Sequence, residues 1–271
     1  MASANDNYFR AFSSLGCAEL ELDEVLSIAS RHHIEAVELR ALADSIDLIA
    51  YFEQKFETPE KLADHIAKSG IRVVALDASC KVISDDTSDR DELIALAPWA
   101  HALGGVWIRV FDGGEKLNAP ELARASEMLT WWQQQRAEHG WNCDLMIETH
   151  DSMITSSQIN RVLETAPAGT WVLWDALHTW NLGGESPTDT WNGISESVAH
   201  IHVKDAVPGK DMQGTRHTLP GNGEYPMAEL RDVLRGSDYR GALSLEWARK
   251  WHTYLPTIET ALIAAKTNRW W

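Results

Sequence analysis

Four short apolar segments of this chain each end in a side chain that can bind a metal ion. The spacings between these four residues are 27, 27 and 44. A strand with its return helix and two loops takes roughly this length, so the equal steps place one such side chain at the same end of successive parallel strands. Three carboxylates and one imidazole that converge on one mouth predict a metal enzyme. The residues are Glu148 in LMIETH, Asp175 in WVLWDALH, His202 in AHIHVKD and Glu246 in LSLEWAR.

Short β-rich runs alternate with longer helical patterns along the whole chain. Eight such units close naturally into a parallel barrel with its helices outside. No linker or low-complexity tract divides the sequence, so we predict a single (β/α)8 barrel domain over residues 1–271. The predicted strands lie near 9–15, 35–40, 71–78, 105–111, 143–150, 170–175, 198–204 and 241–247. The predicted helices lie near 19–32, 58–69, 88–103, 119–139, 155–166, 188–196, 226–236 and 254–267.

Capping residues support two of these helices. Thr58 is a good N-cap, Pro59 suits the first helical position, and Gly70 suits the exit from a helix. The same pattern runs from Asn118 to Gly140. Both helices therefore have predicted ends.

Bulk composition excludes several classes of protein. The net charge is −16, and the 24 basic residues form no run that could follow a phosphate backbone, so nucleic acid is not an expected partner. The first residues lack an apolar signal core, and no apolar run approaches membrane-spanning length, so we expect no membrane partner. Three widely spaced cysteines suit a reducing compartment. We expect a cytoplasmic protein.

The longest stretch without a predicted helix or strand covers residues 205–226 and is rich in glycine and proline. Loops of this length in compact domains are often functional. The stretch follows the strand that carries His202, so we expect it to lie over the barrel mouth as a mobile lid. Arg216 lies within it and is a candidate substrate contact.

Alternation along strands separates the histidines of the predicted mouth. His200, His202 and Lys204 share one strand face, as do Glu148 and His150. His202 is nearer the carboxyl end of its strand than His200. We therefore assign His202 as a metal ligand and His200 as a deeper, structural histidine.

Other polar residues near the strand ends are candidates for substrate binding. His178 lies just beyond its strand and can reach back over the mouth, and Trp180 is a candidate wall on which a sugar face could stack. Glu38 and Arg40 share one face of an early strand and could form an ion pair with each other.

The order and spacing of seven motifs resemble the xylose-isomerase-like TIM barrel family, whose members include sugar phosphate isomerases and epimerases and the endonuclease IV type of DNA-repair enzyme. The motifs extend over nearly the whole chain. They are VELR (37–40), IRVF (108–111), IETH (147–150), WDALH (174–178), HIHVKD (200–205), LPGNGEYP (219–226) and LSLEW (243–247).

The resemblance to ketose epimerases of this family implies one divalent metal ion held by the four strand-end residues, with Glu148 and Glu246 also transferring protons. An oxygen-rich site with one imidazole suits Mn²⁺ or Mg²⁺, and Co²⁺ or Zn²⁺ is also compatible. The implied reaction isomerises or epimerises a small sugar or polyol ketone by removing a proton beside a carbonyl, through an enediolate. The expected substrate contacts are Arg40, Arg109, His150, His178, Trp180, Lys204 and Arg216.

Three alternatives differ in what the barrel would do. A dehydratase acting on an inosose or dehydroshikimate would share the proton abstraction. An endonuclease would need further histidines where the chain reads DASC (77–80) and RVFD (109–112), and neither segment contains one. A barrel that only binds a sugar or a partner protein would not need all four ligand types. Aromatic residues near the C-terminus are consistent with a homodimer.

Overall fold

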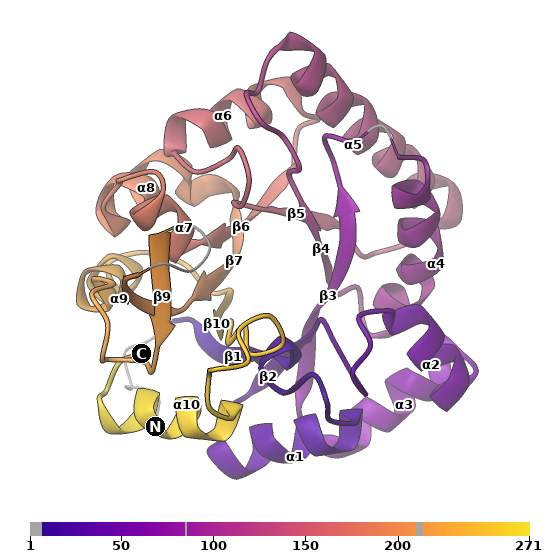
Figure 1. Ribbon diagram of the computed structural model, residues 1–271. Helices are drawn as coiled ribbons and strands as arrows, with labels where there is room; N and C mark the ends of the chain where they lie inside the picture. The colour runs from indigo at the N-terminus through magenta and orange to yellow at the C-terminus, as the bar shows by residue number, and fades with distance from the viewer. Residues whose placement is uncertain (1–6, 85, 210–213) are drawn as a thin grey trace.

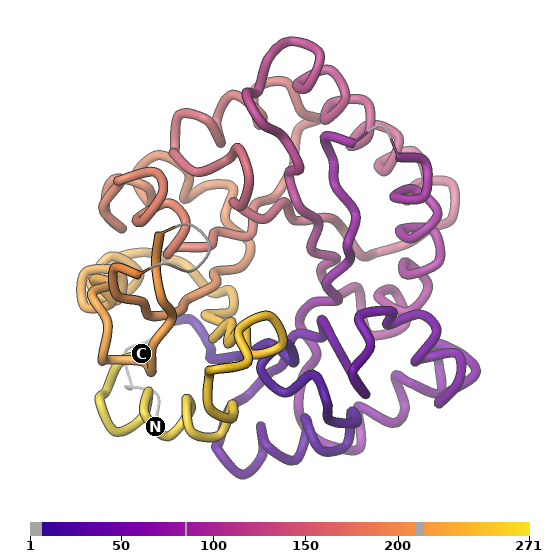
Figure 2. Tube along the Cα trace, viewed as in Figure 1, coloured from indigo at the N-terminus to yellow at the C-terminus, as the bar shows by residue number. Residues whose placement is uncertain are grey.

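Eight parallel strands close into a barrel in the computed structural model, which describes residues 7–84, 86–209 and 214–271. The order around the ring is β1-β10-β7-β6-β5-β4-β3-β2, so the first and last barrel strands are neighbours (Figure 2). The predicted barrel is confirmed. Its strands are β1 (Phe9–Ser13), β2 (Ala36–Leu39), β3 (Arg72–Lys81), β4 (Trp107–Phe111), β5 (Leu145–Glu148), β6 (Trp171–Asp175), β7 (Val198–Val203) and β10 (Ala242–Leu245).

Helices surround the barrel on the outside (Figure 1). Eight of them occupy the predicted positions, and two short ones were not predicted. The predicted helices are α1 (Leu22–His32), α3 (Pro59–Ser69), α4 (Ser88–Ala102), α5 (Ala119–His139), α6 (Ser156–Thr165), α8 (Pro187–Ile194), α9 (Met227–Arg235) and α10 (Ile258–Thr267). The additional elements are α2 (Leu48–Phe56), α7 (Ala176–Asn181) and the 3-10 turns η1 (Ser14–Cys17) and η2 (Ser195–Ser197).

Helix ends follow the local chemistry of the sequence. The Thr58 side chain accepts a hydrogen bond from the backbone N–H of Lys61, and Gly70 ends α3 with a φ of 71°. In α5, Asn118 and Glu121 form a reciprocal capping box. The sequence pattern did not predict α7, and the way this helix begins explains why. Asp175 is both the last residue of β6 and the N-cap, so strand and helix meet with no loop between them.

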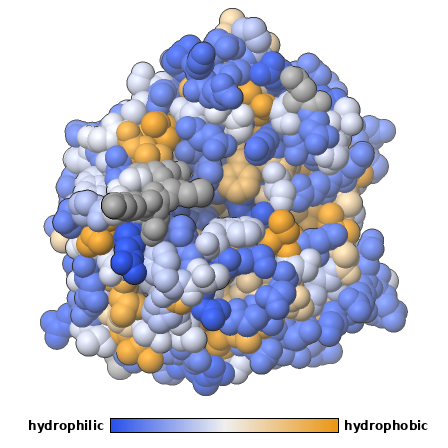
Figure 3. All heavy atoms as spheres, viewed as in Figure 1, coloured by the Kyte–Doolittle hydropathy of each residue, from blue (hydrophilic) through white to orange (hydrophobic). Residues whose placement is uncertain are grey.

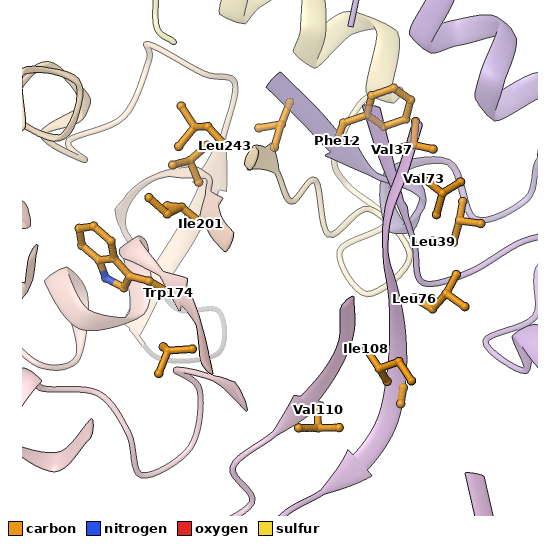
Figure 4. Close-up of a cluster of buried hydrophobic side chains, with 14 of the residues drawn as sticks. Phe12, Val37, Leu39, Val73, Leu76, Ile108, Val110, Trp174, Ile201 and Leu243 are labelled. Atoms are coloured by element: carbon orange, nitrogen blue, oxygen red, sulfur yellow. The ribbon is translucent and has the colours of Figure 1, made fainter. Parts of the chain in front are cut away.

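The apolar core lies between the barrel strands and the helices (Figure 4). Outward-facing strand residues supply much of it, and burial of each such side chain contributes about 1.5–3 kcal/mol. They include Phe12, Val37, Leu76, Ile108, Val110, Trp174, Ile201 and Leu243.

The inside of the barrel changes from apolar to polar along its axis. Two small clusters pack there, one of Ala11, Ala36 and Ala242, the other of Ala75, Met146 and Leu173. Side chains two positions apart in a strand lie on the same face. The residue two positions after each member of these two clusters is buried and polar, so the barrel interior becomes polar toward the carboxyl ends of the strands. They are Ser13, Glu38, Asp77, Glu148, Asp175 and Ser244.

Residues 205–226 are more regular than the sequence predicted. β8 (Asp205–Pro208) and β9 (Thr215–Thr218) form an antiparallel pair, so an irregular loop was the wrong prediction for these segments. Strands of four residues are too short to show alternation among the glycines and prolines. Residues 210–213 lie outside the described part of the chain, and the mobile lid stays a prediction.

Both C-terminal tryptophans are buried against the body of the same chain. Trp270 and Trp271 are 5% and 6% exposed, and the Arg10 guanidinium donates to the Trp271 carbonyl. The exposed aromatics near the C-terminus are instead Trp251 and Tyr254, and the homodimer stays a prediction. Among the described residues, no helix combines the length and the apolar character needed to cross a membrane.

Candidate metal centre

Glu148, Asp175, His202 and Glu246 meet at the carboxyl end of the barrel. Glu148 is the last residue of β5 and Asp175 the last residue of β6, whereas His202 lies within β7 and Glu246 directly follows β10. Asp175 pairs with His202 in strand register. One ligand atom from each residue lies within 4.8 Å of the others. All four side chains are buried, at 0–8% exposure. The structure therefore brings together the four residues that the spacing singled out.

The arrangement of donor atoms fits a divalent cation. His202 Nδ1 lies 3.5 Å from Glu148 Oε1 and 3.7 Å from Glu246 Oε1. These separations exceed hydrogen-bond length, and Nδ1 is buried with no hydrogen-bond partner among the described residues. The space between this ring nitrogen and the two carboxylates is therefore surrounded by ligand atoms of the kinds that bind Mn²⁺, Mg²⁺, Co²⁺ or Zn²⁺.

The surrounding charges also fit a cation. Five buried carboxyl groups in and around this cluster face three permanent cations. Burial raises the pKa of Asp77 to about 7, so at least one of the two extra acids is ionised. Burying this unpaired negative charge is costly, which favours binding of a cation. The acids are Glu38, Asp77, Glu148, Asp175 and Glu246, and the cations are Arg40, Arg109 and Lys204.

Two cations hold Glu148 and Glu246 in their ionised form. Arg109 Nε lies 3.3 Å from Glu148 Oε2, and although burial opposes ionisation, this charge holds the pKa of Glu148 at about 2. Lys204 Nζ lies 2.6 Å from Asp175 Oδ2 and also donates to Glu246. Burial again acts in the opposite direction, but the Lys204 charge keeps the pKa of Glu246 well below its usual range. Both glutamates can therefore accept a proton.

His178 is held by the same strand end. Its backbone N–H donates to Asp175 Oδ1, and its Nδ1 lies 2.9 Å from the Thr149 carbonyl, which can only accept. Nδ1 therefore carries the hydrogen in this contact. Burial lowers the pKa of His178, which favours the neutral ring.

A cavity of about 260 Å³ opens beside the cluster and is lined by two of its ligands, Glu148 and Glu246. Figure 3 shows the molecular surface hollowed near the centre of this face. Its volume is close to the lower end of the range for small-molecule sites, so it suits a small substrate. Five of the seven expected substrate contacts line it. They are Arg40, Arg109, His150, His178 and Lys204.

Trp180 and Arg216 do not line this cavity. Trp180 packs edge-on against Tyr225, with ring centroids 5.8 Å apart. Arg216 is exposed and lies 4.8 Å from the centre of the Tyr254 ring. Adjacent residues of a strand point to opposite sides, and the next residue of β9, His217, is the one that lines the cavity.

Several other cavity residues were not predicted from the sequence. Phe111 follows Arg109 by two positions on β4, so strand alternation could have identified it. Trp251 and His252 lie beyond β10, where no periodic pattern marks them. They line the cavity together with Leu15 and Ala248.

Glu38 forms contacts that the sequence did not predict. It does not pair with Arg40, whose guanidinium donates to Ser79 Oγ at 3.0 Å. Glu38 instead lies 2.8 Å from His200 Nε2 and 2.9 Å from His202 Nε2. The expected Glu38–Arg40 pair is therefore wrong, because Glu38 lies deeper in the barrel, at the level of the histidines.

Comparison with known proteins places this geometry in a family. Residues 26–270 match the family model described as xylose isomerase-like TIM barrel. No curated protein matches the chain.

Solved structures share the fold at low sequence identity. A structure described as a probable 3-DHS dehydratase, AsbF, involved in petrobactin synthesis in Bacillus anthracis, is 17% identical, with a TM-score of 0.73 over 96% of this chain and 99% of that one. The IOLI protein with a bound zinc atom is 15% identical, with a TM-score of 0.75 over 96% of each chain. The 3-keto-D-glucoside 4-epimerase YcjR of E. coli is 13% identical, with a TM-score of 0.67 over 96% and 99%. The match over nearly the whole chain shows that this protein belongs to the xylose isomerase-like TIM barrel family.

Proposed function

We propose that this protein is a divalent-metal-dependent isomerase or epimerase of a small sugar or related hydroxy-ketone. The observation that carries the proposal is the pair of ionised glutamates in a buried four-ligand cluster beside a small cavity lined by both charged and apolar side chains. Glu148 ends β5 and Glu246 follows β10, and two strands separate these positions on the ring. The two carboxylates therefore reach the cluster from different directions.

This separation suits a reaction in which one group removes a proton and the other returns it. A divalent ion held by the four residues would supply Lewis acidity at a carbonyl oxygen of the substrate. One glutamate would take the proton from the carbon beside the carbonyl, as the electron pair moves toward the oxygen. The other would deliver a proton to the opposite face or to the neighbouring carbon. Lys204 and His178, in the cavity wall, would bind substrate hydroxyl groups.

Proton exchange tests this function even while the substrate is unidentified. Purified protein supplied in turn with Mn²⁺, Mg²⁺, Co²⁺ and Zn²⁺ would be incubated in D₂O with ketoses, inososes and dehydroshikimate. We expect deuterium to enter one carbon beside the carbonyl of a substrate, detected by NMR. Absence of exchange with every metal and substrate would contradict the proposal.

Glu246→Gln separates catalysis from folding. An amide cannot act as a base, so we expect exchange to fall by about 10²–10⁴-fold while the protein stays folded. Glu127→Gln is the matched control, because the Glu127 side chain is 73% exposed in a surface pair with Arg90. Full exchange activity in the Glu246→Gln protein would remove Glu246 from the mechanism.

A dehydratase is the second candidate, supported by the structural similarity to AsbF, which is described as a probable 3-DHS dehydratase. It would begin with the same proton removal, after which a β-hydroxyl would leave as water. The same NMR experiment distinguishes the two, since a dehydratase would give a product with a new double bond. Measuring the metal content of the purified protein tests a third alternative, a barrel that only binds ligands, because such a barrel would not need the divalent ion.

A further inference from the structure

Glu38 is a fully buried acid of the barrel interior that does not line the substrate cavity. We propose that Glu38 is a positioning residue of the metal centre: together with His200, it orients the His202 ring so that Nδ1 faces the metal ion. The inference rests on the proposed metal-dependent function. It assigns a role to two residues that are outside the four-ligand cluster.

Distances within this trio define one hydrogen bond and two close contacts. His202 Nε2 lies 3.0 Å from Glu38 Oε2, in a hydrogen bond, and 2.9 Å from Oε1. His200 Nε2 lies 2.8 Å from Oε2. An ionised carboxylate has no hydrogen to give, so His202 Nε2 donates in this hydrogen bond.

Donation from Nε2 determines which nitrogen of His202 can bind a metal. A neutral imidazole has one N–H, and a hydrogen on Nε2 leaves the lone pair on Nδ1. Nδ1 is the nitrogen that faces Glu148 and Glu246. A carboxylate behind a metal-binding histidine fixes the ring orientation and makes the ligand more basic.

His200 supports this arrangement from the deeper side. Its Nε2 lies 2.8 Å from Glu38 Oε2, and the residue is 1% exposed. This close contact restrains the carboxylate so that the oxygens stay directed at His202.

The hydrogen bond of His202 and the close contact of His200 with Glu38 explain the trio better than a second metal ion does. The three groups have one ligand atom each within 4.8 Å. An ion between them would compete for His202 Nε2 while Nδ1 bound the first ion, which would require a fully deprotonated imidazole. The 3.0 Å separation between His202 Nε2 and Glu38 Oε2 is a normal N–H···O distance.

Metal titration of matched variants of the full-length protein tests the assignment. Glu38→Gln keeps the shape of the side chain and removes the charge. Asp77→Asn is the control, because Asp77 is a buried acid on the neighbouring strand β3 that contacts Arg109. Both variants lose one buried acid, so the difference between them reports the contacts of Glu38 with the histidines. Metal-free protein would be titrated with Mn²⁺ and Co²⁺ by competition with a chelating indicator.

We expect the Kd of Glu38→Gln for each metal to rise about 10–100-fold above that of wild type, and clearly above that of Asp77→Asn. We also expect the visible absorption of bound Co²⁺, which reports ligand geometry, to change only in the Glu38 variant. Equal affinities and equal Co²⁺ spectra in the two variants would overturn the positioning role and leave the metal centre intact. Failure of the wild type to bind Mn²⁺, Mg²⁺, Co²⁺ or Zn²⁺ would overturn the metal centre and this inference together.

A second variant covers the case in which Glu38→Gln does not fold. Glu38→Asp keeps the charge but shortens the side chain, so it should weaken metal binding and shift the Co²⁺ spectrum. Circular dichroism of each metal-free variant would verify folding first. Unchanged metal binding in a folded Glu38→Asp protein would count against the proposed geometry.

Discussion

Lys204 is a buried ammonium that stabilises two of the candidate metal ligands. Its Nζ contacts Asp175 and Glu246, and the side chain is 5% exposed. Lys204→Met would leave both carboxylates without this partner. We expect the free energy of unfolding of the metal-free protein to fall by about 3–5 kcal/mol, measured by urea denaturation with a chelator present.

Added metal should reverse part of this loss, because the ion would bind the same carboxylates. Mn²⁺ is therefore expected to stabilise the Lys204→Met protein more than the wild type. Lys61→Met is the control, since Lys61 pairs with Glu57 on the exposed surface of α3 and its loss should change little. Equal stability of the two variants without metal would contradict a stabilising role for Lys204.

At the same scale, the sequence predicted the four ligands but not their support. The ligands could be found because each lies at the end of an apolar strand, where local pattern and spacing suffice. The contact between Glu38 and His202 spans 164 residues and depends on barrel closure. No local sequence pattern shows whether the partner of Glu38 lies across the barrel or two positions further along the same strand. Arg40, two positions away, was therefore the predicted partner.

Among the elements, the segment after β7 is organised by one carboxylate. Asp205 accepts hydrogen bonds from the backbone N–H groups of Ala206, Gly221, Gly223 and Tyr225. Buried backbone donors need such partners, so Asp205 fixes the path of residues 221–225 back to the hairpin. The same hairpin brings His217 to the cavity.

Gly223→Ala tests this organisation. A Cβ at position 223 would lie 2.1 Å from Asp205 Oδ1, so the carboxylate or the backbone would have to move. We expect a stability loss of about 1–3 kcal/mol and faster limited proteolysis within residues 205–226. Gly236→Ala is the control, because the nearest atom there would lie 3.5 Å away. Similar proteolysis and stability in both variants would show that Asp205 does not organise the segment.

The predicted and missed elements differ in length and in the cues that mark them. The ends of α3 and α5 were predictable because proline, glycine and capping residues mark them. α2 lies in a stretch that follows a strand and precedes α3, where the sequence pattern predicted only a loop. The β8–β9 hairpin is stabilised by pairing with itself and by Asp205, and neither feature has a local signature.

For the whole molecule, the location of the charges matters more than their sum. The −16 net charge has contributions from exposed helix faces, such as Asp23 and Glu127, where each group is hydrated. The barrel interior holds a smaller excess of acids, but these are buried. Electrostatic cost is greatest where water is absent, so the interior is where a cation stabilises the fold most.

Divalent metal should therefore raise the thermal stability of the whole protein. A ligand that binds only the folded state, at 100 times its Kd, adds about 2.7 kcal/mol to the free energy of unfolding. We expect calorimetry to show a higher unfolding midpoint with at least one of Mn²⁺, Mg²⁺, Co²⁺ and Zn²⁺ than with a chelator. Glu148→Gln should lose most of this increase, because it removes a ligand, whereas Glu127→Gln should retain it. A midpoint that does not respond to any of the four metals would mean that the carboxylate excess is balanced by protons or by the protein's own cations.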